Sequence, residues 1–179
     1  MKTLTLLRHA KSSWDDPSMR DFDRPLNRRG RAAARTMGRE MRALGLDFDA
    51  VVASPAMRVM ETVEGLSEGY GNRLHPDYDR RIYLASVETL LEIVRGTDDA
   101  HARLLLLGHN PGFELLALAL VIADGAEARG KLAEKYPTGA LAEIELPVAQ
   151  WRDAGPGTGT LSRFIRPRDL DPKLGPETD

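Results

Sequence analysis

The chain has 179 residues, 42% of them hydrophobic, which suits one globular domain with a sizeable buried core and leaves little room for a second domain. Its formal net charge is −2 at pH 7, so no global positive field favours nucleic acid or an anionic membrane as a partner. Cysteine is absent, which excludes disulfides, thiolate nucleophiles and zinc bound through cysteine, and fits a reducing compartment.

Strand and helix signals alternate along the chain. Residues 3–7 are predicted as a buried strand, and residues 27–44 as a helix that Asn27 caps and Gly45 ends. The elements predicted next are a strand at 49–53, a helix beginning near Pro55, a helix at 86–96, a strand at 103–107, an apolar helix at 112–123 and strands at 140–146 and 160–165. This alternation predicts a single-domain α/β fold with three α/β/α layers and a mostly parallel sheet.

The two ends of the chain carry further information. The apolar run at residues 4–7 meets Arg8 too soon for a signal-peptide core, and no later apolar run is long enough to span a bilayer. We therefore expect a cytoplasmic protein that does not enter the membrane. Proline and charge dominate residues 166–179, so we expect a folded domain at residues 1–165 followed by a mobile tail.

Cations and imidazoles follow three of the predicted strands. Arg8 and His9 end the first, Arg58 comes shortly after the second, and His109 follows the strand at 103–107. The carboxyl ends of parallel strands share one edge of a sheet, and open α/β folds bind their ligands there. Arginine matches phosphate geometry with its planar fork and stays charged. The pattern therefore predicts a site for an anionic phosphoryl group.

The ordered set of segments around these residues resembles the histidine phosphatase superfamily, whose members are phosphoglycerate-mutase-like, and most of all its SixA-type phosphohistidine phosphatases. The resemblance spans residues 3 to about 145. Its segments are Leu7-Arg8-His9-Ala10-Lys11, residues 21–26 leading to Gly30, Ser54-Pro55-Ala56-Met57-Arg58 with Thr62, Ile82-Tyr83, Gly108-His109-Asn110-Pro111 and residues 137–140. An isolated Arg-His pair carries almost no information, whereas the ordered set is specific.

The resemblance implies that His9 attacks phosphorus as a neutral imidazole and forms a phosphohistidine that water hydrolyses, while Arg8, Arg58 and His109 hold the phosphoryl oxygens. The residues alone leave open that His9 acts as a general base. In both cases the imidazole must be unprotonated, and the neighbouring arginines disfavour its cationic form. His75, in a polar context outside the motif, is expected to be an ordinary surface residue.

Four further residues are candidates for substrate binding. In the SixA-like pattern an aspartate three residues before an Arg-Pro-Leu arginine lines the site, and Asp21 and Arg24 hold those positions. A solvated loop with local ion pairs is the alternative for this pair. Lys11 follows the nucleophile and is expected at the mouth of the site. Asn110 follows His109, in a segment that is also a turn leading into a helix.

The position of the general acid departs from the wider superfamily. Mutases and many small-molecule phosphatases place a glutamate after the third strand, and in this chain Arg80 lies at or next to that position. Asp79, one residue away, and Asp21 are the candidate acids. If neither carboxylate reaches the leaving group, the substrate needs a good leaving group, and phosphohistidine provides one.

These observations lead to one interpretation and two alternatives. We interpret the chain as a metal-independent phosphatase without a cofactor that acts through His9 on phosphohistidine in a protein partner, because no Asp, Glu and His cluster has metal-ligand spacing. The first alternative is a phosphatase of small phosphoesters such as sugar phosphates, with Asp79 or Asp21 as its acid. The second is a non-catalytic phosphate-binding module.

Overall fold

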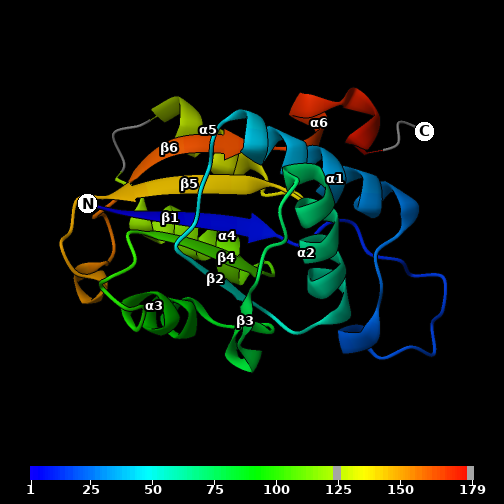
Figure 1. The fold of residues 1–179 in the computed structure, drawn as a ribbon, viewed down its shortest axis with the longest axis horizontal. Helices are drawn as coiled ribbons and strands as arrows, with labels where there is room; N and C mark the ends of the chain where they lie inside the picture. Colours follow the sequence, from blue (N-terminus) through cyan, green and yellow to red (C-terminus); the bar gives the residue numbers. More distant parts are fainter. Residues whose placement is uncertain (123–125, 177–179) are drawn as a thin grey trace.

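The computed structural model describes residues 1–122 and 126–176, and six strands form its central sheet in the order β3-β2-β4-β1-β5-β6 (Figure 1). The strands are β1 (Lys2–Arg8), β2 (Ala50–Ala53), β3 (Asp77–Tyr78), β4 (Arg103–Gly108), β5 (Leu141–Leu146) and β6 (Thr160–Ile165). Strands β1 to β4 are parallel, β5 is antiparallel to β1, and β6 is antiparallel to β5. The predicted α/β class with a mostly parallel sheet is confirmed.

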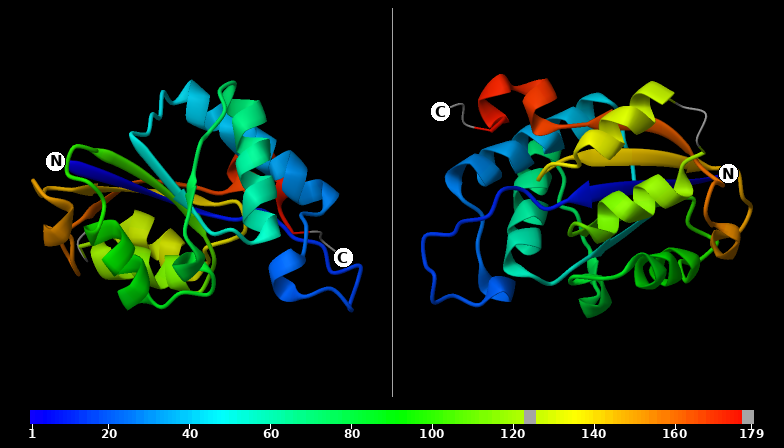
Figure 2. Two further views of the ribbon diagram at one scale, coloured as in Figure 1. Left: turned by 60° about the horizontal axis from the view of Figure 1, so that its bottom comes forward. Right: turned by 180° about the vertical axis from the view of Figure 1, so that it is seen from behind.

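Helices cover both faces of this sheet (Figure 2). The helices α1 (Arg28–Ala43) and α2 (Met57–Tyr70) pack on one face. The helices α3 (Val87–Arg95), α4 (Gly112–Leu120) and α5 (Ala126–Glu134) pack on the other. The expected three layers are therefore present, and α5 and the two-residue strand β3 are elements that the sequence did not predict.

The central strands β1 and β4 supply the core to both layers. Leu4 and Leu6 belong to the apolar cluster under α3 and α4, whereas Leu7 belongs to the cluster under α1 and α2. All three are fully buried. Successive side chains of a strand point to opposite faces, so a continuous apolar run is what a sheet covered on both sides requires.

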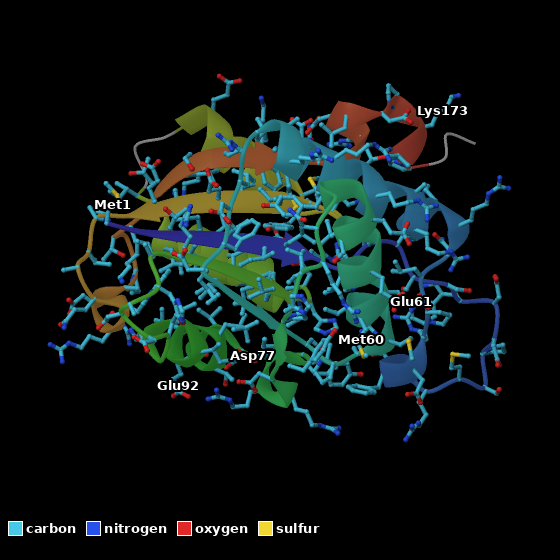
Figure 3. The ribbon with its side chains drawn as sticks, in the orientation of Figure 1. Met1, Met60, Glu61, Asp77, Glu92 and Lys173 are labelled. Carbon is cyan, nitrogen blue, oxygen red and sulfur yellow. The ribbon has the colours of Figure 1, made fainter. Side chains whose placement is uncertain are left out.

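The helix α1 begins and ends as its sequence predicts. The Asn27 side chain accepts a hydrogen bond from the Gly30 amide at 2.8 Å, and Gly45 follows the helix with φ of +66°. Gly30 lies against the loop that follows β1, because a Cβ placed on it would be 2.1 Å from the Lys11 carbonyl oxygen. In the same region Glu61 of α2, which is labelled in Figure 3, accepts a hydrogen bond from the Leu26 amide. These contacts place α1 and α2 beside the carboxyl end of β1.

The C-terminal segment differs from the prediction. A mobile tail was expected over residues 166–179, but the structure has a short helix α6 (Pro167–Leu170) and a 3-10 turn at Pro172–Leu174. Arg166 and Asp169 form a capping box around Pro167, which starts α6. Arg29 of α1 donates a hydrogen bond to the Gly175 carbonyl at 2.8 Å and holds the segment against the domain. Regular structure and a contact with α1 are therefore present where the composition predicted a tail, and residues 177–179 lie outside the described residues.

Other boundaries shift by a few residues. The apolar helix predicted at 112–123 ends at Leu120, and residue 123 lies outside the described residues. The helix expected near Pro55 begins at Met57. Among the residues that the structure describes, no helix is both long enough and apolar enough to cross a membrane.

Candidate active site

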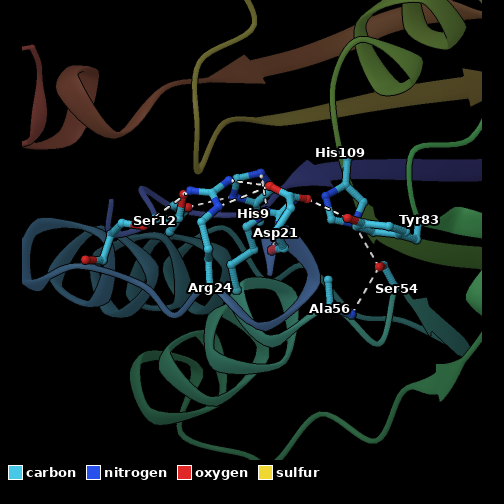
Figure 4. A network of polar contacts seen from close by, with 11 residues as sticks. His9, Ser12, Asp21, Arg24, Ser54, Ala56, Tyr83 and His109 are labelled. Carbon is cyan, nitrogen blue, oxygen red and sulfur yellow. Dashed lines mark hydrogen bonds and ion pairs between the residues drawn. The ribbon is translucent and has the colours of Figure 1, made fainter. Parts of the chain in front are cut away.

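The carboxyl edge of the sheet brings the predicted phosphate-binding residues together, and Figure 4 shows His9 and His109 there. Arg8 ends β1, His109 follows β4, and Arg58 lies in the first turn of α2. The His9 amide donates to the Gly108 carbonyl at 3.0 Å, which joins the ends of β1 and β4. The rings of His9 and His109 then lie with their centroids 5.4 Å apart.

Hydrogen bonds fix the tautomer of His9. Its Nδ1 lies 2.7 Å from the Ala10 carbonyl oxygen. A carbonyl only accepts, so Nδ1 carries the proton and Nε2 keeps its lone pair. The Nε of Arg58 donates toward that lone pair at 3.4 Å. The unprotonated nitrogen of His9 therefore faces a guanidinium, where an anionic phosphoryl group would be held.

The surroundings of His9 keep its imidazole neutral. Burial lowers its pKa well below 6.5, the hydrogen bond to the Ala10 carbonyl opposes this shift, and the neighbouring His109, Arg58 and Arg8 lower the pKa further. The residue is only 7% exposed, so desolvation of the cation dominates. The imidazole is unprotonated at neutral pH, which both nucleophilic attack and general-base catalysis require.

His109 is also neutral and has one ring nitrogen free of protein partners. Its Nε2 lies 2.8 Å from Ser54 Oγ, and its buried Nδ1 has no hydrogen-bond partner within the described chain. Burial and the charge of Arg58 lower its pKa to about 3. When the Ser54 hydroxyl donates to Nε2, the neutral ring carries its proton on Nδ1 and is a donor for an oxyanion.

Arg58 is almost fully buried and is held by Asp21. Its Nη1 donates to the Asp21 backbone carbonyl at 2.6 Å and its Nη2 to the Asp21 carboxylate at 3.0 Å. Partial burial raises the pKa of the Asp21 carboxyl, but hydrogen bonds from Tyr83 and Arg24 and the charge of Arg58 lower it to about 2. Asp21 is therefore a carboxylate anion that orients the guanidinium.

Arg24 extends this network away from the sheet. It donates to the Asp21 carboxylate at 3.0 Å and to Ser12 Oγ at 2.6 Å, and its guanidinium lies 3.5 Å from the centre of the Trp14 ring. The Arg24 side chain is 9% exposed. The solvated loop considered for Asp21 and Arg24 is therefore wrong for Arg24, which is a buried part of the wall of the site.

Arg8 keeps donor capacity for a ligand. Its Nη1 donates to the Tyr136 carbonyl at 2.9 Å, while its buried Nε has no hydrogen-bond partner in the described part of the chain. Burial lowers the pKa of Arg8, and Glu114 opposes the shift. A guanidinium stays protonated despite such a shift, so Arg8 adds a positive charge with unused N–H groups.

Comparison with known proteins agrees with this geometry. Residues 4–82 match the family model of the histidine phosphatase superfamily (branch 1). An uncharacterised protein of Mycobacterium tuberculosis H37Rv is 34% identical over 164 residues, which cover 90% of this chain and all of that protein. The chain belongs to the histidine phosphatase superfamily. The enzyme class that this membership supports is a phosphatase.

Solved structures place the chain within this superfamily by fold as well. It superposes on a structure described as a putative phosphohistidine phosphatase SixA from Agrobacterium tumefaciens with a TM-score of 0.77 and 26% identity, covering 92% of this chain and 97% of that one. A structure described as a putative SixA from Nakamurella multipartitia gives a TM-score of 0.81 and 25% identity, covering 93% and 96%. The expected resemblance to SixA-type proteins is confirmed.

The other two candidate substrate-binding residues lie in different surroundings. In this member of the histidine phosphatase superfamily, the side-chain Nδ2 of Asn110 donates to the Tyr136 backbone carbonyl at 3.0 Å. The side-chain Oδ1 of Asn110 accepts from the backbone amide of Glu114 at 3.3 Å. These contacts fix the start of α4. Lys11 lines a cavity together with Arg8. The structure thus puts Lys11 beside the site and uses the Asn110 side chain to hold the backbone.

Asp79, one of the two candidate acids, forms an ion pair with a neighbouring arginine. Its carboxylate pairs with Arg81 at 2.6 Å, and that hydrogen bond lowers the pKa of Asp79, opposed by partial burial. Arg80 lies over the Phe22 ring, 5.2 Å from its centre. Asp21 is therefore the candidate carboxylate that the structure brings into the network around Arg58.

The structure adds two residues to which the sequence analysis gave no function. Tyr83 donates its hydroxyl hydrogen bond to the Asp21 carboxylate at 2.5 Å, and its ring packs edge-on against His109. Thr62 of α2 accepts from the Ala10 amide at 3.0 Å and donates to the Arg58 carbonyl at 2.6 Å. Both lie in segments that carry the family resemblance, so that resemblance was the signal that pointed to them.

Proposed function

We propose that this phosphatase transfers a phosphoryl group to His9 Nε2 and that its substrate is phosphohistidine in a protein partner. The observation that carries the proposal is the lone pair of His9 Nε2, fixed by the hydrogen bond of Nδ1 to Ala10 and directed at Arg58. A module that only bound phosphate would gain nothing from a neutral imidazole held with its unprotonated nitrogen toward the anion.

The proposed reaction has two displacements. The Nε2 lone pair attacks phosphorus, the bond from phosphorus to the nitrogen of the protonated substrate ring breaks, and that ring keeps the electron pair and departs as neutral imidazole. Water then attacks the phosphorus held on His9 and releases phosphate, which returns the electron pair to Nε2. Arg8, Arg58 and the free Nδ1 of His109 supply donors to the oxygens as negative charge spreads over them.

The state of the carboxylates favours a substrate that needs little help from an acid. Asp21 has a pKa of about 2 and holds no proton to donate at neutral pH, and Asp79 is paired with Arg81. An alkoxide leaving group needs a proton in the transition state, whereas a protonated phosphohistidine ring leaves as neutral imidazole. This difference supports phosphohistidine over the sugar phosphates of the alternative interpretation.

The donor set also supports catalysis without a metal. The groups that face His9 Nε2 are guanidinium and imidazole nitrogens, and within residues 1–122 and 126–176 no cluster of three or more His, Asp or Glu side chains could hold a metal ion. Two arginines can supply the positive charge that a metal supplies in other phosphoryl-transfer enzymes.

The test is phosphate release by the purified protein, with and without EDTA, from a phosphohistidine protein and from a panel of aryl and alkyl phosphates. We expect release from the phosphohistidine protein to be insensitive to EDTA. Rapid acid-free quenching should show label on His9 that is stable in base and lost in acid. The variant His9→Ala should lose turnover and label, whereas His75→Ala, on an exposed imidazole, should retain both.

The same panel tests the leaving-group argument. Rates should fall steeply as the pKa of the leaving group rises, so aryl phosphates should react and alkyl phosphates should not. The variant Asp79→Asn should change none of these rates. A flat dependence in the wild-type protein that becomes steep in Asp21→Asn would identify Asp21 as a working acid and favour the small-phosphoester alternative.

A further inference from the structure

A cavity of about 260 Å³ lies beside the site and is walled by segments that are far apart in the sequence. The loop after β1, the first turn of α1, residues 135–138 and the C-terminal segment from Pro167 to Pro176 all line it. The C-terminal segment sits against α1 in both Figure 1 and Figure 2. The ordered tail therefore completes this cavity.

The lining of the cavity carries positive charge only. Its charged side chains are Arg8, Lys11, Arg29, Lys135 and Arg168, and no described acidic residue lines it. The chain as a whole has a net charge of −2, so this grouping does not follow from composition. Cations that line one concave surface raise the local positive potential and attract anions.

These cations are left available by the protein. In the described chain no ion pair neutralises Lys11, Lys135 or Arg168. Arg29 donates one N–H to the Gly175 carbonyl, which orders the wall without removing its charge. Arg103, by contrast, is paired with Asp49. Unneutralised like charges around one hollow are stabilised when an anion enters.

Arg8 connects the cavity to the catalytic residues. It lines the cavity, and it also precedes His9 with a buried Nε free for a phosphoryl oxygen. A ligand whose phosphoryl group contacts Arg8 at His9 would therefore have this cavity next to it. Whole small-molecule pockets have volumes of about 300–1,000 Å³, so a hollow of this size suits one group of a larger ligand.

We propose that this cavity holds a second anionic group of the substrate, so that the preferred substrates carry a carboxylate or another phosphate besides the phosphoryl group that is transferred. This inference rests on the proposed phosphatase function. The second anion has two sources: an acidic side chain close to phosphohistidine in a protein, or an acidic group within a small phosphoester. The chemistry that the cavity recognises is the same in both.

The test compares substrates that differ only in the second charge. One arm uses 3-(carboxymethyl)phenyl phosphate and its neutral amide, whose leaving groups are matched because a methylene separates the charge from the ring. The other arm uses phosphohistidine peptides with Glu or Gln beside the phosphohistidine. In the arm that matches the natural source of the second anion, we expect kcat/KM of the anionic substrate to exceed that of its neutral counterpart about tenfold. The reason is that each exposed ion pair contributes a few-fold.

Charge-removal variants locate the effect. Lys135→Ala combined with Arg168→Ala should bring the preference close to one and leave turnover of the neutral member unchanged. The matched control, Arg73→Ala combined with Arg152→Ala, removes the same charge from exposed positions that do not line the cavity and should keep the preference. Lys135→Ala alone, on an exposed side chain, should lower the preference about threefold even if the Arg168 change loosens α6.

The outcomes separate this inference from the proposed function. Equal rates for both members in both arms, or a preference that the cavity variants leave intact, would overturn the cavity assignment while phosphatase activity stood. Absence of turnover with every substrate would overturn the proposed function instead. In that case the paired phosphates are titrated calorimetrically into the protein, and equal affinity for the anionic and neutral members would overturn the cavity assignment as well.

Discussion

Acidification is expected to destabilise the protein through His109. The folded state holds this imidazole neutral with a pKa of about 3, against its ordinary value of 6.5, because it is buried beside Arg58. Below pH 6.5 the unfolded chain therefore takes up a proton on this residue that the folded chain does not. Stability is complete above pH 6.5 and falls as the pH decreases toward 3, where the folded state is protonated too.

The magnitude follows from this interval. A pH of 5 lies about 1.5 units below the pKa of the imidazole in the unfolded chain, and each unit corresponds to about 1.4 kcal/mol. His109 alone should therefore lower the free energy of unfolding by about 2 kcal/mol between pH 7 and pH 5. His9 acts in the same direction because burial lowers its pKa as well. Asp21, with a pKa of about 2, loses its contribution only at lower pH.

Urea unfolding at pH 7 and pH 5, in buffers without phosphate or sulfate, measures the effect. His109→Asn should lose about 2 kcal/mol less than the wild-type protein between the two pH values, whatever its stability at pH 7. His75→Asn removes an exposed imidazole and should leave the wild-type pH dependence unchanged. An identical pH dependence in His109→Asn and wild type would show that His109 is not held neutral by the fold.

Substitutions at three other positions test the site and its support. Arg58→Ala should lower kcat/KM by about 100-fold or more. Arg58→Lys should restore only part of this loss, because an ammonium group does not reproduce the planar array of guanidinium donors; full rescue would show that a positive charge alone is enough at this position. Thr62→Val leaves the buried Ala10 amide without an acceptor and should lower the free energy of unfolding in urea by about 1–3 kcal/mol. Thr62→Ser keeps the hydroxyl and should be close to wild type, so equal stability of the two variants would contradict this prediction. Gly30→Ala places a methyl group against the Lys11 carbonyl and should destabilise by about 1–3 kcal/mol, which an unchanged thermal midpoint would disprove.

The local pattern of the sequence indicated the fold class and the edge of the sheet at which the site lies. The apolar runs that end at Arg8 and His109 are buried on both faces, and only a covered parallel sheet accommodates such strands. Parallel strands place their carboxyl ends at one edge, so His9, Arg58 and His109 had to lie near one another. The helix at residues 27–44 was equally local, since Asn27 and the residue after its end carry its signals.

The partners of those residues were beyond the reach of the sequence. The Asp21 carboxylate accepts hydrogen bonds from Tyr83 and Arg58, which lie 62 and 37 positions away in the sequence. These contacts lower the pKa of Asp21 and keep it a carboxylate anion. The sequence offered Asp79 and Asp21 equally as candidate acids. In the structure Asp79 is paired with Arg81, and only Asp21 lies in the network around Arg58.

In the C-terminal segment, too, the sequence predicted one state and tertiary contacts decided another. Composition predicted a mobile tail, because proline and charge supply little apolar area to offset the entropy of ordering. Contacts with α1 nevertheless hold residues 166–176 in place and close the basic cavity beside Arg8. Strands and capped helices depend on interactions between near neighbours in the chain, which a sequence records directly. The tautomer of His9, the charge of Asp21 and the walls of the cavity depend on groups that only the packed structure brings together.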